Sequence, residues 1–183
     1  VLASGRKFNM SDMIALQHDY VSIPARSLVP FFKDLRAADP QVEQARQLLL
    51  DWDFVLDRDS VTAGIYVAFE RQLLDNINAL KVPAEAQDFL TVGMKTAIDM
   101  LLAPDGDFGP DPLTGRDEFI LRTLAEAVVI LREKLGPNRE DWVYGQANYK
   151  HALIRHPLSS AVSEELRAQL DVGPAPRLSL IHI

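Results

Sequence analysis

The sequence contains no cysteine, which excludes two classes of site at once. Neither a disulfide framework nor a thiolate zinc site can form, and the compartment cannot be read from redox usage, so periplasm and cytosol both stay open. Long apolar runs are also missing: the longest are far shorter than the roughly 20 residues that cross a bilayer. The first residues show no basic-then-apolar signal pattern. We therefore expect no membrane partner.

Positive charge is scarce as well. The chain carries 19 lysine and arginine residues against 26 aspartate and glutamate residues, a formal net charge of −7 at pH 7. The charges lie in mixed-sign stretches, such as Arg116 to Glu118 and Arg132 to Lys134, so no basic face is available to neutralise a phosphate backbone. The sequence therefore predicts no nucleic-acid partner.

What the sequence does contain is enough apolar material for one core. Its 183 residues are 48% hydrophobic and 25% charged, which is typical of a globular domain. The chain has neither an initiator methionine nor a signal pattern. We therefore expect it to be a piece of a longer polypeptide.

Helical signals run through the chain and predict a mainly α fold. Asn9 with Asp12, Asp39 with Pro40, and Ser60 are typical helix starts, and residues 24–35 are predicted to form a further helix. Apolar residues recur at spacings of three and four, which predicts buried stripes. These stripes are Val42, Ala45, Leu49 and Trp52; Tyr66, Phe69, Leu73, Ile77 and Leu80; Leu90, Met94, Ala97 and Leu101; and Ile120, Leu124, Val128, Leu131 and Leu135.

Charged residues complete these helix predictions. Glu70, Arg71 and Asp75 are expected to face away from the stripe of their helix. Asp117 and Glu118 are expected in the first turn of the last long helix, where negative charge suits the helix dipole, and Gly136 ends it. The proline- and glycine-punctuated stretch 104–115 is predicted to be a loop.

Chemically able side chains gather in YGQANYKHALIRHPLSSAV, residues 144–162. His151 and His156 are five residues apart with no glutamate between them, so the helical zinc pattern His-Glu-x-x-His is absent. Ser159 and Ser160 are close to His156 only in sequence, whereas a nucleophile and its base must meet in space. This stretch is therefore interpreted as structural.

Two other patterns also fail as sites. An EF-hand loop begun at Asp105 would need glycine and glutamate where the chain has Pro110 and Arg116, so the acidic loop is interpreted as a solvated turn. Ser4 to Lys7 has the serine-lysine spacing of some acyl-transfer enzymes but no companion motif. We assign no catalytic, cofactor-binding or metal-binding residue within the chain, and expect no cofactor.

Several separated stretches, in one order, resemble the later part of the catalytic chain of the penicillin acylase family. They are FNMSDMIALQHDYVSIPARSLVP at 8–30, LLLDWDFVLDRDSVTAGIYVAFERQL at 48–73, WVYGQANYKHALIRHPLS at 142–159 and VGPAPR at 172–177. The resemblance implies that residues 1–177 are a partial catalytic domain, a helical portion that would flank the αββα two-sheet core of an N-terminal-nucleophile hydrolase.

The resemblance also implies an activity. The parent protein would be a periplasmic or secreted amidohydrolase that cleaves itself from a precursor and attacks an acyl-amide bond with an N-terminal serine. That serine and its oxyanion asparagine would lie upstream of residue 1, so the chain alone is expected to be inactive. Its expected partners are the remainder of its own precursor, namely the small chain and the core sheets, and in the parent a small-molecule amide substrate.

Two further expectations concern the C-terminal residues and an alternative function. The last six residues, LSLIHI at 178–183, resemble translated sequencing adapter and are expected to be a non-native tail; the alternative is a short apolar strand. The alternative function is a free-standing helical domain that binds another protein through an apolar groove. The acyl group that the parent accepts is left open, because β-lactam side chains, acyl-homoserine lactones and peptides all fall within such families.

Overall fold

A computed structural model of the chain describes residues 7–17, 19–87, 89–146, 152–154, 156, 158–170 and 172–175, and these are mainly α-helical, as the sequence predicted. Within these residues the helices are α1 (Met10–Gln17), α2 (Ile23–Leu28), α3 (Pro40–Leu50), α4 (Val61–Lys81), α5 (Met94–Leu102), α6 (Pro112–Leu135) and α7 (Glu164–Leu170). Short 3-10 turns are η2 (Val29–Phe32), η3 (Ala84–Ala86), η4 (Gly106–Phe108), η5 (Arg139–Asp141) and η6 (Ser159–Ala161). The strands β1 (Ala152–Ile154) and β2 (Val172–Ala175) pair in antiparallel fashion.

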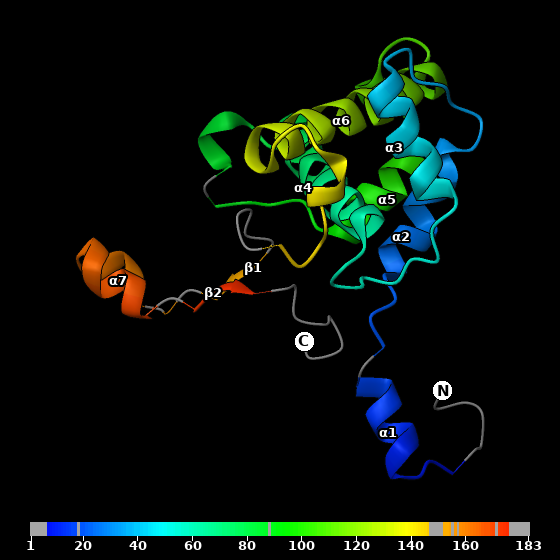
Figure 1. Cartoon of the computed structure of the whole chain (residues 1–183). Helices are drawn as coiled ribbons and strands as arrows, with labels where there is room; N and C mark the ends of the chain where they lie inside the picture. The colour runs from blue at the N-terminus through cyan, green and yellow to red at the C-terminus, as the bar shows by residue number, and fades with distance from the viewer. Residues whose placement is uncertain are drawn as a thin grey trace.

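Helices α2 to α6 form a bundle in which the two longest helices, α4 and α6, make the most extensive contact (Figure 1). Helix α3 packs on both of them, and α5 packs on α2 and α4. Helix α1 lies apart from this bundle, as does α7 beside the two-stranded sheet (Figure 1). The largest fully buried side chains come from this bundle and from η2, which connects α2 to α3: Leu28, Phe32, Leu49, Ile65, Tyr66, Phe69, Leu73, Ile77, Leu101, Ile120, Leu124 and Leu131.

The predicted helix starts are confirmed by their hydrogen bonds. Asn9 and Asp12 form a reciprocal capping box before α1, with each side chain accepting the other's backbone amide at 2.9–3.0 Å. The Asp39 carboxylate accepts from the amides of Gln41 and Val42 at the start of α3. The Ser60 hydroxyl accepts from the amide of Ala63 at 3.1 Å. Each cap satisfies amides that the first helical turn leaves without partners.

Two helices depart from their predicted bounds at the N-terminal end of the chain. Helix α1 ends at Gln17, before the predicted Tyr20. The predicted helix 24–35 is split into α2 and the 3-10 turn η2. Pro30 lies inside that turn, and because it has no amide hydrogen it cannot donate the bond that would continue an α-helix.

The stripe predicted on α4 is correct for Tyr66, Phe69, Leu73 and Ile77, which are all buried, but wrong for Leu80, which is 40% exposed. Glu70 was predicted to face away from the core, and this is also wrong, because only 1% of its surface is exposed. Every residue from 63 to 70 is buried. The N-terminal half of α4 is covered by other elements on all sides, so a one-sided stripe does not describe it.

The helices on either side of the predicted loop 104–115, α5 and α6, also differ from the prediction. Helix α6 begins at Pro112, so residues 112–115 are helical rather than loop, and Asp117 and Glu118 lie beyond its first turn. Proline needs no amide partner and therefore favours the first turn. Leu90 precedes α5 and is 58% exposed. Only Ala97 and Leu101 of that predicted stripe are buried.

Trp52 lies two residues beyond the end of α3 and is buried, as predicted. Its ring lies 5.1 Å from that of Tyr66 on α4 and 5.8 Å from that of Phe54. Its Nε1 donates to the carbonyl oxygen of Val55 at 3.1 Å, so the polar edge of the indole is satisfied. Phe54 adopts a φ of 68°, which turns the chain back toward α4.

Candidate functional site

The stretch 144–162 is divided between buried anchors and exposed turns. Tyr144 is buried, and its amide donates to the carbonyl oxygen of Ser60 at 3.0 Å. His156 is exposed, and its Nδ1 accepts from the amide of Leu158 at 3.2 Å, so the ring shapes its own turn. Ser159 is buried, and its carbonyl oxygen accepts from Arg167 Nε at 2.8 Å. These contacts support a structural interpretation; Tyr149, Lys150 and His151 lie outside the described residues, as do residues 1–6 and 178–183.

The aspartates of the loop before α6 have separate local roles. Asp105 accepts from the amide of Asp107, and the Asp107 carboxylate pairs with Lys81 at the end of α4. Asp111 accepts the hydroxyl hydrogen of Thr114 at 2.7 Å, and this bond lowers the pKa of Asp111. Within the part of the chain that the structure describes, no three His, Asp or Glu side chains are placed to hold a metal ion. None of the described helices is both long and apolar enough to span a membrane.

A groove of about 490 Å³ lies between α4, η4 and α6. The residues that line it are Asn76, Ala79, Leu80, Asp107, Phe108, Gly115, Glu118, Phe119, Arg122 and Glu126. The volume lies within the usual range for small-molecule sites. We call this feature the α4–α6 groove.

Asn76 and Glu126, which line the α4–α6 groove, belong to an amide and carboxylate network. Glu126 Oε2 accepts from Asn76 Nδ2 at 2.7 Å and from Gln72 Nε2 at 3.2 Å. Asn76 Nδ2 also donates to Thr123 Oγ1 at 3.0 Å, and Thr123 is fully buried. Because these bonds join side chains of α4 to side chains of α6, the network fixes the spacing of the two walls.

Aromatic rings also line the groove. Phe108 and Phe119 meet edge to face, with ring centroids 5.4 Å apart and planes at 78°. The guanidinium carbon of Arg122 lies 5.4 Å from the centroid of the Phe119 ring. A side chain at Gly115 would overlap the carbonyl oxygen of Phe108, so η4 can pack this closely only on glycine. The groove thus combines an aromatic surface with carboxylates from two elements.

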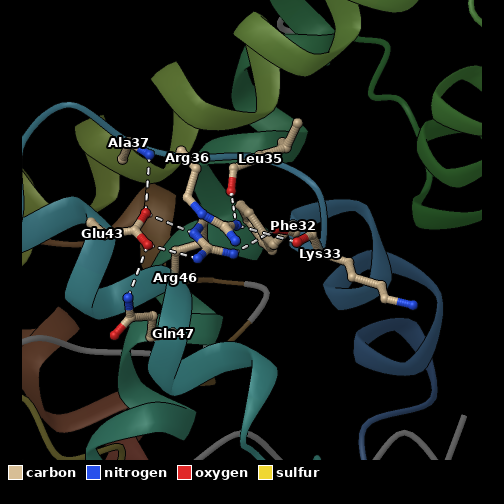
Figure 2. A network of polar contacts seen from close by, with 8 residues as sticks. All are labelled: Phe32, Lys33, Leu35, Arg36, Ala37, Glu43, Arg46 and Gln47. Carbon is tan, nitrogen blue, oxygen red and sulfur yellow. Dashed lines mark hydrogen bonds and ion pairs between the residues drawn. The ribbon is translucent and has the colours of Figure 1, made fainter.

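A second polar cluster lies between α3 and η2, and Figure 2 shows it from close by. Arg46 is only 3% exposed and forms two hydrogen bonds with Glu43, at 2.8 Å and 2.7 Å. Its third bond, at 2.7 Å, goes to the carbonyl oxygen of Phe32. Glu43 also accepts from the amide of Ala37 and from Gln47.

The positive charge of Arg46 is paired with the negative charge of Glu43. The Arg46 guanidinium, followed by the Ala37 amide, holds the pKa of Glu43 well below its usual value, and Glu43 raises the pKa of Arg46. Arg46 is buried while Glu43 is partly exposed, and desolvation of the guanidinium offsets part of the attraction between them. The cluster joins α3 to η2 and is structural.

A third junction holds the segment 142–145 against the start of α4. Gly145 donates its amide to the carbonyl oxygen of Arg58 at 2.7 Å, and Trp142 Nε1 donates to the carbonyl oxygen of Gly136 at 2.9 Å. A Cβ on Gly64 would overlap the carbonyl oxygen of Trp142. Two of the stretches that carry the family resemblance, 48–73 and 142–159, therefore meet here in space.

Sequence reasoning found neither the α4–α6 groove nor the Arg46 cluster. Asn76 and Glu126 are 50 positions apart, and no local spacing connects them. Arg46 sits on the buried side of α3, where the stripe analysis counted only apolar residues. In the described residues several polar side chains join separate elements, and the structure defines a mainly helical domain.

The comparison with protein families identifies the family of this helical domain. The model of the penicillin amidase family matches residues 1–178, and the chain belongs to that family. The match confirms the resemblance carried by the four stretches and supports a hydrolase of the penicillin acylase type as the parent. A comparison with curated proteins finds none that matches this chain.

Proposed function

We propose that the chain is the helical part of an amidohydrolase that cleaves the bond between an acyl group and an amine. The observation that carries the proposal is the family match, which covers residues 1–178 of the 183. The nucleophile would be an N-terminal serine supplied by a part of the enzyme outside these residues. This assignment agrees with the described contacts of Tyr144, His156 and Ser159, which hold the backbone in place.

The proposed chemistry does not require a histidine. The α-amine of an N-terminal serine has a pKa near 8, so it accepts the hydroxyl proton close to neutral pH. The serine oxygen attacks the amide carbonyl, hydrogen-bond donors stabilise the oxyanion, and the amine leaves with the proton. Water then releases the acid from the acyl-enzyme. Such a serine is freed when a precursor cleaves itself, which is the maturation we propose for the parent.

The role of this chain in that enzyme would be support. Its partner would be the remainder of the precursor, namely the small chain and the core sheets, and the complete enzyme would act on a small-molecule amide in the periplasm or outside the cell. Fractionation of cells that express the full-length gene tests the location, and we expect the mature enzyme outside the cytoplasm. Activity confined to the cytoplasmic fraction would contradict this part of the proposal.

The experiment that tests the function compares the 183-residue chain with the full-length gene product. Phenylacetyl, long-chain acyl and β-lactam amides with chromogenic leaving groups are offered to both. We expect hydrolysis of at least one substrate by the full-length product and none by the chain alone.

The matched variant is His156→Ala in the full-length product. It should keep most of the activity per folded molecule, because the ring of His156 accepts the amide of Leu158 and so shapes a local turn, which is a structural role. Burst release of the leaving group by the 183-residue chain, abolished by His156→Ala, would overturn the proposal and make residues 144–162 an active site.

A further inference from the structure

We propose that the α4–α6 groove binds a small organic cation, an ammonium or guanidinium group carried on a flat apolar body. The inference does not depend on amide hydrolysis. It rests on the shape of the groove, on its charge and on a cation of the chain itself that already lies on its aromatic surface. Each of these observations points to the same ligand chemistry.

The shape suits a compact aromatic compound. The cavity of about 490 Å³ is bounded by helices on two sides and by η4 at one end. Its apolar lining comes from Ala79 and Leu80, which are exposed, and from Phe108 and Phe119, which are only 9% and 6% exposed, so little of either ring is open while Arg122 stands over Phe119. Leu80 is 40% exposed although it ends an otherwise buried stripe, so the groove leaves an apolar surface open that the fold itself does not cover.

The charge of the lining favours a cation. Three carboxylates, Asp107, Glu118 and Glu126, line the groove together with a single guanidinium. Asp107 is paired with Lys81, and Glu126 accepts from two side-chain amides. Glu118 is exposed and forms no ion pair with any other described residue. An incoming cation would therefore gain a carboxylate partner at Glu118 without breaking an existing pair.

Arg122 shows where that cation would lie. Its guanidinium stands over the Phe119 ring, 5.4 Å from the centroid, in the arrangement of a cation–π contact. Yet its side chain is 65% exposed, and its Nε is 3.9 Å from Glu126 Oε1, too long for a hydrogen bond. Arg122 thus occupies the aromatic surface loosely. A ligand cation would compete with it for the same ring.

The test uses the 183-residue chain and benzylammonium as the probe, followed by the shifts of backbone amide signals in NMR spectra. We expect saturable shifts at residues of the groove with a Kd of about 1 mM, the affinity typical of a fragment of this size. Benzyl alcohol has the same body without the charge, and benzoate reverses the charge. Both should bind at least about threefold more weakly, since they lose the contact with Glu118 and the cation–π contact.

Substitutions separate this site from non-specific binding. Arg122→Met removes the competing cation and should tighten benzylammonium binding by about threefold, whereas Glu118→Gln should weaken it by about threefold. Arg132→Met, an exposed position farther along α6, removes the same charge outside the groove and should change nothing. The proposal is overturned if no saturable shifts occur, if they map outside the groove, if benzyl alcohol binds as tightly as benzylammonium, or if Arg122→Met fails to tighten binding.

Discussion

Gly64 lets the backbone of Trp142 lie directly on α4. Gly64→Ala places a methyl group where the Trp142 carbonyl oxygen now lies, and neither backbone can move without disturbing a buried helix. We expect a loss of about 2 kcal/mol, since overpacking of this kind costs roughly 1–3 kcal/mol. Thermal unfolding followed by circular dichroism measures it. Gly106→Ala is the control, because a Cβ there meets nothing within 4 Å, and it should be nearly neutral.

Glu43 links stability to pH. In the folded state, the hydrogen bonds from Arg46 hold the pKa of Glu43 below its ordinary value of 4.5. Above that value both the folded and the unfolded state are ionised, and the contribution to stability is complete. As the pH falls below it, the unfolded state takes up the proton first, and the contribution is lost.

Glu43→Gln should therefore lower the unfolding midpoint most around pH 7 and progressively less toward about pH 3, in urea titrations at each pH. Arg46→Met should reduce the same pH dependence, because the largest cause of the lowered pKa of Glu43 is gone while the bond from the Ala37 amide remains. A constant difference between wild type and Glu43→Gln across this range would show that the pair does not titrate as described.

At the scale of elements, the start of α4 depends on one hydroxyl. Ser60 Oγ accepts from the Ala63 amide and so satisfies a donor that the helix cannot. Ser60→Ala should cost about 1 kcal/mol in the free energy of unfolding, whereas Ser60→Thr keeps an acceptor and should cost only a fraction of that. Chemical denaturation of the three proteins gives both values. Equal losses for alanine and threonine would assign the effect to packing instead of capping.

Elements also show why some predictions succeed. Asn9, Asp39 and Ser60 were identified as helix starts because a cap involves only residues two or three positions away. The bounds of α6 were missed at its start, where Pro112 begins the helix inside a stretch that glycine and proline made look like a loop. Glycine and proline indicate that a helix begins or ends nearby, but they do not show whether they belong to the helix or to the loop.

At the scale of the whole molecule, the bundle and α1 are separate in space (Figure 1). Met10, Met13 and Ile14 of α1 are each at least 48% exposed, so they contribute little to the core. Deleting residues 1–17 should change the free energy of unfolding of the bundle by less than about 0.5 kcal/mol. Thermal unfolding of the truncated chain checks this. A larger loss would mean that α1 is held by the bundle in solution.

The predominance of helix could be predicted from the sequence because caps and apolar stripes involve residues only a few positions apart. The family could be predicted because four separated stretches occur in one order along the chain. All four stretches that carry the resemblance fall within the residues that the family model matches. The helix caps also lie at the predicted residues. The spacing on α4 predicts the burial of Tyr66 and Leu73 correctly. It does not show that Glu70 is also covered or that Leu80 is left exposed, because both depend on which elements pack around the helix.

Tertiary structure alone decided which polar groups meet. Asn76 and Glu126 are joined across α4 and α6, Arg46 reaches the carbonyl oxygen of Phe32, and Trp142 rests on Gly64. None of these contacts follows from periodicity, because each depends on how two elements far apart in the sequence pack together. The physical reason is one of range: capping and amphipathicity act over a few residues of chain, whereas the α4–α6 groove exists only after the bundle has closed around its core.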